Sequence, residues 1–428
     1  MRAMKDSGIP WIGEIPQGWK VCRIKDVAML YNGNSIKDEE KDNYTNPENT
    51  YPYISTKDID ATYLSINYTN GLYTSKDDRT FKIAQKDSCL MCIEGGSAGK
   101  KKAYVEQDVS FVNKLCCFAP HKMDGKYLFY YLCSPTFESE FYKYISGLIG
   151  GVSVSTLKNF IQLLPPLADQ QKIAEFLDRK CAEVDEMIAL QEQIIEELKA
   201  YKQSVITEAV TKGLNPAAPM RDSGIEWIGS IPEHWEVKRL KQESIFINGF
   251  AFDSEEFKID EGVRVIRIGD IGLKADFENC VRAITNPSIL TPYRIENGDI
   301  LIAMSGATTG KCCIVDEAEE AYINQRVGII RSDIRKIIYY SLQTPYFMEF
   351  VNLNNAGSAQ PNISSKAIGE FPILNIPLDE QYAIAEYLDC KCSEIDSLIQ
   401  TKQSKIDSLK EYKKSIIYEY VTGKREVE

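Results

Sequence analysis

The sequence predicts an α+β protein: two α/β modules separated by two long helices that pair as an antiparallel coiled coil, with an internal pseudo-two-fold repeat. A tryptophan-containing element, SGIPWIGEIPQGW, stands near the start of the chain and recurs as SGIEWIGSIPEHW 216 residues later. Two long segments without internal Gly or Pro also repeat, which is typical of paired helices. The length of 428 residues exceeds what one ordinary core supports.

The chain order is module, helix, module, helix. PLADQQKIAEFLDRKCAEVD at 166–185 aligns with PLDEQYAIAEYLDCKCSEID at 377–396, an offset of 211 residues. Module edges are nearly identical whereas module interiors diverge. Gene duplication alone explains the edges, but two copies of one scaffold that read different things explain the divergence. The predicted segments are the first module at 1–166, a spacer helix at 167–213, the second module at 214–377 and a second spacer helix at 378–428.

The modules read as mixed strands and helices. YPYIS and VRVIRIG are short strands, and 86–105 and 296–315 each read as strand, Gly-rich turn, strand. The segments 126–145 and 334–353 are amphipathic helices interrupted at a proline. Neither Gly-rich turn has the G-x-x-x-x-G-K-[ST] spacing of a phosphate loop, so we exclude nucleotide hydrolysis.

The two long segments are predicted to pair with each other. Their apolar positions step by three and four residues, as in a coiled-coil seam, and polar residues interrupt both seams at matching places. Polar seam residues fix register and partner, and 44 residues of helix span roughly 65 Å. The predicted seam residues are Val184, Ile188, Gln191, Ile195 and Leu198 in the first helix, and Ile395, Ile399, Lys402, Ile406 and Leu409 in the second.

Composition restricts the chemistry. The chain has only two histidines, which disfavours a His-based hydrolase or metal site. Its twelve cysteines are expected to be reduced and packed, and no second motif completes a zinc set with the C-x-x-C at Cys89–Cys92. No apolar run of about 18 residues and no leader segment is visible, so the expected location is the cytoplasm.

The chain resembles the specificity subunit, HsdS, of type I restriction-modification systems. The doubled SGI-x-WIG-x-IP-x-x-W element, the paired PL-x-x-Q-x-x-IA-x-[FY]LD helices and the G-x-x-Q-x-N-IS element at 357–364 carry the resemblance, which covers essentially the whole chain. The first module departs from it, because GLIGGVSVS at 147–155 lacks the Gln and Asn of that element.

The resemblance implies that each module is a target-recognition domain that reads one half of a split double-stranded DNA site. The helices then set the gap between the half-sites and dock methyltransferase subunits (HsdM), two of them, with endonuclease subunits (HsdR) also in the complex. The chain itself has no catalytic residue, metal or cofactor, and S-adenosylmethionine belongs to the partner methyltransferase. The Trp11 and Trp227 elements are structural edges of the scaffold rather than intercalating groups.

The predicted DNA contacts are polar residues of module loops, because such side chains reach groove edges and phosphates. In the first module they are Asn34, Ser35, Lys57, Lys100, Lys101 and Lys102, the last three on a hairpin turn. In the second they are Arg264, Arg267, Thr308, Thr309, Lys311, Arg326, Gln360 and Asn362.

The net charge of −12 is unevenly divided. The first module carries +1, the helices −4 and −3, and the second module −6, so more than half of the excess acid lies on the helices. We expect the isolated chain to bind DNA weakly and to need its partner for phosphate contacts.

Two other functions were weighed. A helical scaffold that binds proteins and no DNA fits the acidic charge but not the divergent duplicated modules. A fused adenine methyltransferase would require an [ND]-P-P-[YF] element, and the chain shows only Leu-Pro-Pro-Leu at 164–167.

Overall fold

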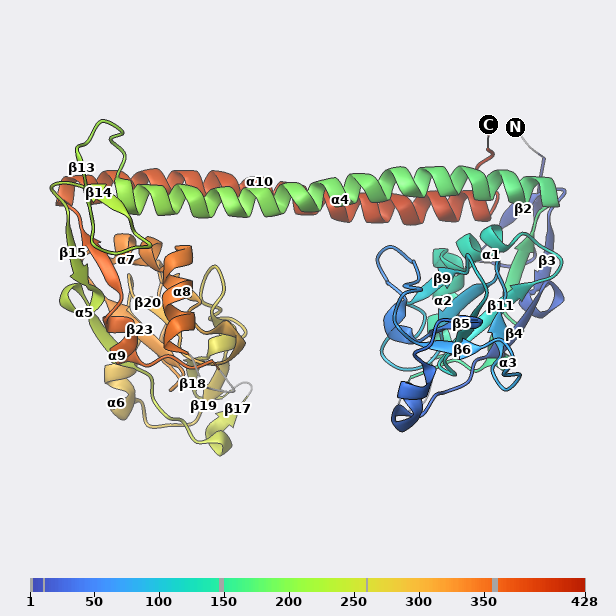
Figure 1. Ribbon diagram of the computed structural model, residues 1–428, viewed down its shortest axis with the longest axis horizontal. Coiled ribbons are helices and arrows are strands. Elements are labelled where there is room, and N and C mark those ends of the chain that lie inside the picture. Colours follow the sequence, from blue (N-terminus) through green and yellow to red (C-terminus); the bar gives the residue numbers. More distant parts are fainter. Residues whose placement is uncertain (1–2, 11, 146–149, 259–260, 356–360, 428) are drawn as a thin grey trace. The chain divides into compact units, whose positions relative to one another are not determined.

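The chain forms two compact units, of residues 1–192 with 403–428 and of residues 193–402. Figure 1 shows the computed structural model, which describes residues 3–10, 12–145, 150–258, 261–355 and 361–427. Two helices run through both units: α4 at Leu167–Lys212 and α10 at Leu378–Val421. Each unit therefore holds one module, the start of the helix that follows the module, and the end of the other long helix.

The first module contains two four-stranded sheets. One has the strand order β4-β11-β8-β9, and the other, β6-β5-β10-β7, contains the parallel pair β5 and β10. Strand pairs β1-β2 and β12-β3 complete it. The strands are β1 Met4–Asp6, β2 Glu14–Pro16, β3 Lys20–Arg23, β4 Ala28–Asn32, β5 Thr50–Ile54, β6 Tyr73–Ser75, β7 Ile83–Ala84, β8 Cys89–Cys92, β9 Lys102–Tyr104, β10 Val109–Phe111, β11 Leu115–Pro120 and β12 Ile161–Leu164.

Three short helices accompany these sheets: α1 at Gly125–Leu132, α2 at Pro135–Lys143 and α3 at Val154–Leu157. Pro135 is the first residue of α2, where its missing N–H costs nothing, and the Ser134 hydroxyl accepts from the Phe137 N–H at 3.3 Å. The predicted interruption of the helix is thus confirmed. Strand β8 is buried on both faces, which explains its continuous apolar run.

The second module repeats this plan. Its sheets are β16-β23-β20-β21 and β17-β19-β18-β22, the latter with the parallel pair β18 and β22, and its strand pairs are β13-β14 and β15-β24. The strands are β13 Met220–Asp222, β14 Ser230–Pro232, β15 Glu236–Arg239, β16 Ile245–Asn248, β17 Phe257–Lys258, β18 Val263–Ile266, β19 Val281–Ala283, β20 Ile300–Ala303, β21 Cys312–Ile314, β22 Ala321–Ile323, β23 Val327–Arg331 and β24 Pro372–Asn375. The helices are α5 Leu240–Glu243, α6 Pro287–Leu290, α7 Arg335–Leu342, α8 Pro345–Asn354 and α9 Ser365–Gly369.

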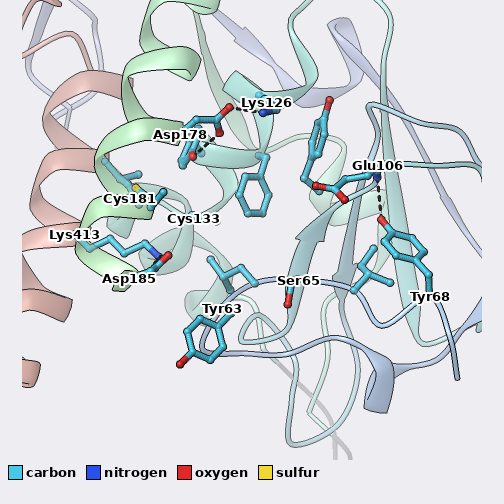
Figure 2. A pocket seen from close by; sticks show the side chains of 17 residues that line it. Tyr63, Ser65, Tyr68, Glu106, Lys126, Cys133, Asp178, Cys181, Asp185 and Lys413 are labelled. Atoms are coloured by element: carbon cyan, nitrogen blue, oxygen red, sulfur yellow. Dashed lines mark hydrogen bonds and ion pairs between the residues drawn. The ribbon is translucent and has the colours of Figure 1, made fainter. Parts of the chain in front are cut away.

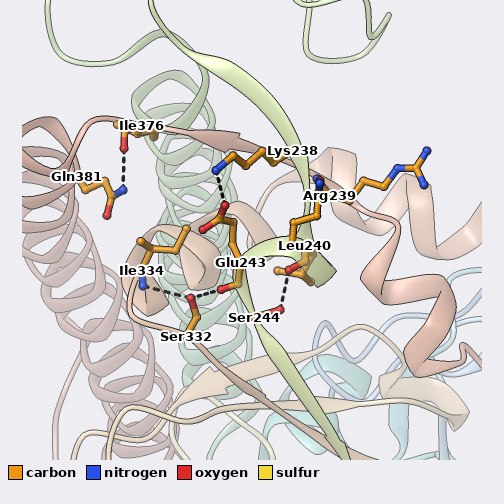
Figure 3. A network of polar contacts seen from close by, with 10 residues as sticks. Lys238, Arg239, Leu240, Glu243, Ser244, Ser332, Ile334, Ile376 and Gln381 are labelled. Carbon is orange, nitrogen blue, oxygen red and sulfur yellow. Dashed lines mark hydrogen bonds and ion pairs between the residues drawn. The ribbon is translucent and has the colours of Figure 1, made fainter.

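A polar network ties strand β15 and helix α5 of the second module to the loop that precedes α7 (Figure 3). Lys238 contacts the Glu243 carboxylate at 2.5 Å, and the Ser332 hydroxyl donates to the Glu243 carbonyl. The Ser332 hydroxyl also accepts from the Ile334 N–H at 3.2 Å, so one side chain connects α5 to the residue that precedes α7. The network therefore joins α5 to the residues that lead into α7.

Each module is fastened to both long helices by one tryptophan. In the first unit, Trp19 is 1% exposed, its indole N–H donates to Asp169 at the start of α4, and a Cβ on Gly423, just past α10, would lie 3.1 Å from its ring. In the second unit, Trp235 has the same relation to Glu380 of α10 and to Gly213, which follows α4.

Both of these glycines have positive φ, of +70° and +73°, as a helix C-terminal cap requires. The repeated element of the sequence is therefore a structural fastening. The repeated glutamine of the two long helices is also structural. The Gln170 side chain donates to the Pro165 carbonyl, just before α4, and the Gln381 side chain donates to the Ile376 carbonyl, just before α10.

The two long helices pair in antiparallel fashion within each unit. In the first unit, Lys413 of α10 lies 2.7 Å from Asp185 of α4, and in the second Lys202 of α4 lies 2.7 Å from Asp396 of α10. The coiled coil predicted from the sequence is thus confirmed, and two repeat-related lysines, Lys202 and Lys413, form ion pairs between the helices. Of the predicted seam residues, Val184, Ile188, Gln191, Ile195, Ile395 and Ile406 are buried, and Leu198, Ile399, Lys402 and Leu409 are half-buried.

Candidate nucleic-acid interface

In the first module, the ends of several strands meet at one edge. The parallel pair β5 and β10 aligns Phe111 with Ile54, so both strands end together. The Val112 N–H donates to the Ile54 carbonyl, and the Asn34 N–H donates to the Phe111 carbonyl, each at 2.9 Å. The loops that follow β4, β5 and β10 therefore lie side by side.

The β8–β9 hairpin completes this edge. The Ile93 N–H donates to the Lys114 carbonyl at 3.0 Å, and the Lys101 ammonium donates to the Thr56 carbonyl at 2.8 Å. The Val152 N–H donates to the Ile93 carbonyl at 3.0 Å. We name the set the first loop cluster, and it comprises residues 33–36, 55–58, 93–101, 112–114 and 150–152.

The second module builds the same edge from different residues. The Asn324 N–H donates to the Ile266 carbonyl at 3.0 Å, and the Met304 N–H donates to the Arg326 carbonyl at 2.9 Å. The Ile363 N–H donates to the Met304 carbonyl at 2.9 Å. The second loop cluster comprises residues 249–252, 267–270, 304–311, 324–326 and 361–363.

One acidic residue in each cluster, Asp58 and Asp270, stabilises a turn. Asp58 accepts from the Ser55 N–H and Asp270 from the Arg267 N–H, each at 2.8 Å. Burial raises the pKa of the Asp270 carboxyl above its ordinary value. These two carboxylates are thereby used inside the turns, whereas Glu94 of the first loop cluster is exposed.

The structure brings most predicted contacts of the first module to the first loop cluster. Ser35, Lys57 and Lys100 are exposed there. Asn34 is half-buried, and its side chain accepts from the Lys82 N–H at 3.0 Å, while Lys101 is half-buried against Thr56. Exposure leaves Ser35, Lys57 and Lys100 as the free side chains of this predicted set.

The structure contradicts the predicted DNA contact at Lys102. Its side chain is 3% exposed, and the ammonium lies 2.6 Å from Glu138 and donates to the Leu132 carbonyl at 3.0 Å. Lys102 is the first residue of β9, and successive residues of a strand point to opposite faces. A run of three lysines therefore places its last member beneath α1 and α2, where it cannot reach DNA.

In the second module, Arg267, Lys311, Arg326 and Asn362 are exposed in the second loop cluster. The structure contradicts the predicted DNA contact at Thr309, because this residue is 7% exposed and its hydroxyl donates to the Gly306 carbonyl at 2.7 Å. Two further predicted residues are partly engaged: Thr308 is half-buried, and Arg264, on β18, forms an ion pair with Glu319 at 2.9 Å. Gln360 and Trp11 lie outside the described residues, and Trp227 is half-buried.

The sequence reasoning missed three exposed residues of the clusters, Asn113, Lys114 and Gln325. They occupy the turns that join β10 to β11 and β22 to β23. The internal repeat could have revealed these residues. However, the offset of 211 residues that aligns the two long helices aligns Asn113 with Asn324. The backbone hydrogen bonds instead match Val112 with Asn324.

A cavity of about 390 Å³ lies where the first module meets the helix pair of its own unit (Figure 2). Lys126 of α1 pairs with Asp178 of α4, which also accepts from the Tyr130 hydroxyl at 2.7 Å. The Asp185–Lys413 pair lies farther along the same wall. The contacts of Lys126 and Tyr130 with Asp178 hold the first module on α4, and the Asp185–Lys413 pair holds α4 against α10.

The described residues show no group of three or more His, Cys, Asp or Glu able to hold a metal ion. Cys89 and Cys92 both lie in β8 but enter different core clusters, so they do not share a site. Within the same part of the chain, no helix is long and apolar enough to cross a membrane.

Comparisons with known proteins match this architecture. The family model described as "Type I restriction modification DNA specificity domain" matches residues 16–200 and again 232–411. The MjaVIII specificity subunit of Methanocaldococcus jannaschii is 29% identical over 96% of this chain and 93% of its own length. The EcoKI specificity subunit of Escherichia coli is 24% identical over 88% of this chain and 82% of its own.

Two solved structures share the fold. A chain from a type I R-M system complex superposes with a TM-score of 0.72 at 17% identity, covering 96% of this chain and 99% of that one. The HsdS subunit from Thermoanaerobacter tengcongensis gives a TM-score of 0.50, also at 17% identity, covering 96% of this chain and 98% of its own.

Proposed function

Because the chain belongs to the type I restriction modification DNA specificity family, we propose that each module reads one half of a bipartite double-stranded DNA target. Family membership makes the protein a DNA specificity subunit. The observation that supports the division of labour is the pair of loop clusters. They have the same hydrogen-bonded frame and different exposed residues, as two readers of different half-sites require.

We further propose that the protein has no catalytic role of its own and directs a methyltransferase and an endonuclease. S-adenosylmethionine is assigned to the methyltransferase subunit. A complex that acts on the chromosome of a prokaryote works in the cytoplasm, which is the location that we propose. The paired helices set the distance between the half-sites.

The helix surface supports docking of two methyltransferase subunits. Met187 and Tyr412 are 48% and 51% exposed in the first unit, and their repeat counterparts Leu398 and Tyr201 are 49% and 56% exposed in the second. In each unit this repeat-related pair consists of one large aliphatic and one tyrosine side chain from opposite helices. Equivalent apolar positions in both units suit two copies of one partner.

Methylation sequencing tests the proposal. The chain is co-expressed with candidate methyltransferase partners, and adenine methylation is mapped on host DNA by single-molecule sequencing. We expect a split motif, methylated on both strands, with a fixed gap. Exchange of residues 1–166 for the module of another subunit changes one half of the motif and leaves the other half and the gap.

A stable complex that neither methylates nor prefers any DNA sequence would contradict DNA reading and support a protein-binding scaffold. A change in both halves after exchange of one module would contradict the division between the modules. Exchange of residues 214–377 is the matched control, because it must alter the other half.

A further inference from the structure

The turns that join β10 to β11 and β22 to β23 are equivalent, residue by residue. Phe111 pairs with Ile54 in the first module, and Ile323 pairs with Ile266 in the second. In each module the N–H of the next residue donates to that same partner, at 2.9 Å and 3.0 Å. The local offset is therefore 212 residues, one more than in the helices.

This register places Lys114 and Arg326 at the same position. The Lys114 carbonyl accepts from the N–H that follows β8, and the Arg326 carbonyl accepts from the N–H that follows β20. Both turns close in the same way, with Leu115 donating to Val112 at 3.0 Å and Val327 to Asn324 at 2.8 Å. Each cation is thus carried by a backbone that is hydrogen-bonded on both sides.

Both side chains are exposed. Among the described residues, neither has an ion-pair or hydrogen-bond partner for its charged group, whereas Arg264, Lys102 and Arg331 are paired with acids. An unpaired cation on a rigid turn keeps its charge available to a polyanion. It recurs in loop clusters that otherwise differ, which suits a contact that does not depend on sequence.

We propose that Lys114 and Arg326 are the phosphate anchors of the two modules, each neutralising one backbone phosphate of the half-site that its module reads. The proposal rests on the proposed function. The anchors set the position of each loop cluster on the duplex, and neighbouring loop residues then discriminate bases.

The salt dependence of binding tests the anchors. The probe is a fluorescein-labelled duplex that carries the motif found by methylation sequencing, and the protein is the complete complex with its methyltransferase. Lys114→Ala and Arg326→Ala each lower the magnitude of the slope of log K against log salt by about 0.9, and the double variant by about 1.8. Affinity falls by the same factor on duplexes altered in either half-site, and Lys114→Arg retains the wild-type slope.

Lys122→Ala is the matched control, since Lys122 is exposed and follows β11 whereas Lys114 precedes it. It leaves the slope unchanged. An unchanged slope in Lys114→Ala and Arg326→Ala would contradict the anchors, as would a loss restricted to one base sequence, which indicates base reading. If the wild-type complex shows no sequence preference, the proposed function fails; if it shows the preference and the variants keep its slope, only the anchors fail.

Discussion

Lys100 and Lys102 show how much the surroundings of a residue decide. They lie two positions apart on one hairpin, yet Lys100 is exposed and Lys102 is enclosed between Glu138 and the Leu132 carbonyl. A buried cation is retained only where it is paired, because an unpaired charge in the interior is very costly. Lys102 therefore belongs to the core of the first module.

Replacement of these lysines separates the two roles. Lys102→Ala lowers the free energy of unfolding by about 3 kcal/mol, because it leaves a partly buried carboxylate and a carbonyl without their partner. Lys100→Ala changes it by no more than about 0.5 kcal/mol. Urea unfolding followed by circular dichroism measures both, and equal losses would contradict the assigned environments.

Among the elements, the long helices recognise each other through polar residues as well as apolar ones. The repeat makes Lys202 equivalent to Lys413 and Asp396 equivalent to Asp185, and each lysine pairs with the aspartate of the other helix. Because both pairs form only in the antiparallel register, they select this pairing over a parallel one.

A double-mutant cycle measures this selection. Alanine substitutions at Lys202 and Asp396 give a coupling free energy of about 0.5–1 kcal/mol, as expected for a partly exposed pair. The same substitutions at Lys202 and Asp185, which lie in different units, are additive within error. Coupling in the second cycle, or none in the first, would contradict the register.

The proposed docking of methyltransferase subunits gives a prediction at the helix surface. Tyr201→Glu and Tyr412→Glu each reduce the number of bound methyltransferase subunits from two to one, and the double variant binds none, because a buried charge at a contact costs several kcal/mol. Native mass spectrometry counts the subunits. Tyr382→Glu is the control, because Tyr382 is 69% exposed and its repeat counterpart is Gln171. Full occupancy in the double variant would place the docking surface elsewhere.

The elements themselves were largely predictable from the sequence. Helix periodicity, proline positions and Gly-rich turns are local signals, so the long helices, the helix break at Pro135 and the hairpin turns followed from them. The environments of Lys102 and Thr309 depend on strands and loops distant in sequence. The equivalence of Lys114 and Arg326 was hidden, because one inserted residue shifts the repeat between the helices and the turns.

In the whole molecule, the first unit is built from both ends of the chain. The Tyr127 hydroxyl donates to the Val421 carbonyl at 3.0 Å, and the Lys424 ammonium donates to the carbonyls of Ile12 and Glu14. Ile416, Ile417, Tyr420 and Val421 share the core of the first module. The last helix is therefore an integral part of a module that begins more than 400 residues earlier.

Truncation tests this closure. Removal of residues 403–428 exposes the core side of α1, so we expect amide hydrogen exchange in α1 and β3 to rise to the rate of locally open structure. A chain that ends after Lys424 keeps the contacts to Tyr127 and Ile12 and serves as the control. Unchanged protection in the longer truncation, measured by exchange and mass spectrometry, would show that the first module is stable without α10.

Because the end of α10 completes the core of the first module, this module cannot be finished until late in translation. The ribosome completes the first module about 255 residues before it reaches the end of α10, a delay of roughly 13–50 s at ordinary elongation rates. During that time the core of the first module lacks Ile416, Ile417, Tyr420 and Val421, and Trp19 lacks its contact with Gly423. A message cut short before α10 therefore yields a chain whose first module is exposed to aggregation, although all of residues 1–166 have been made.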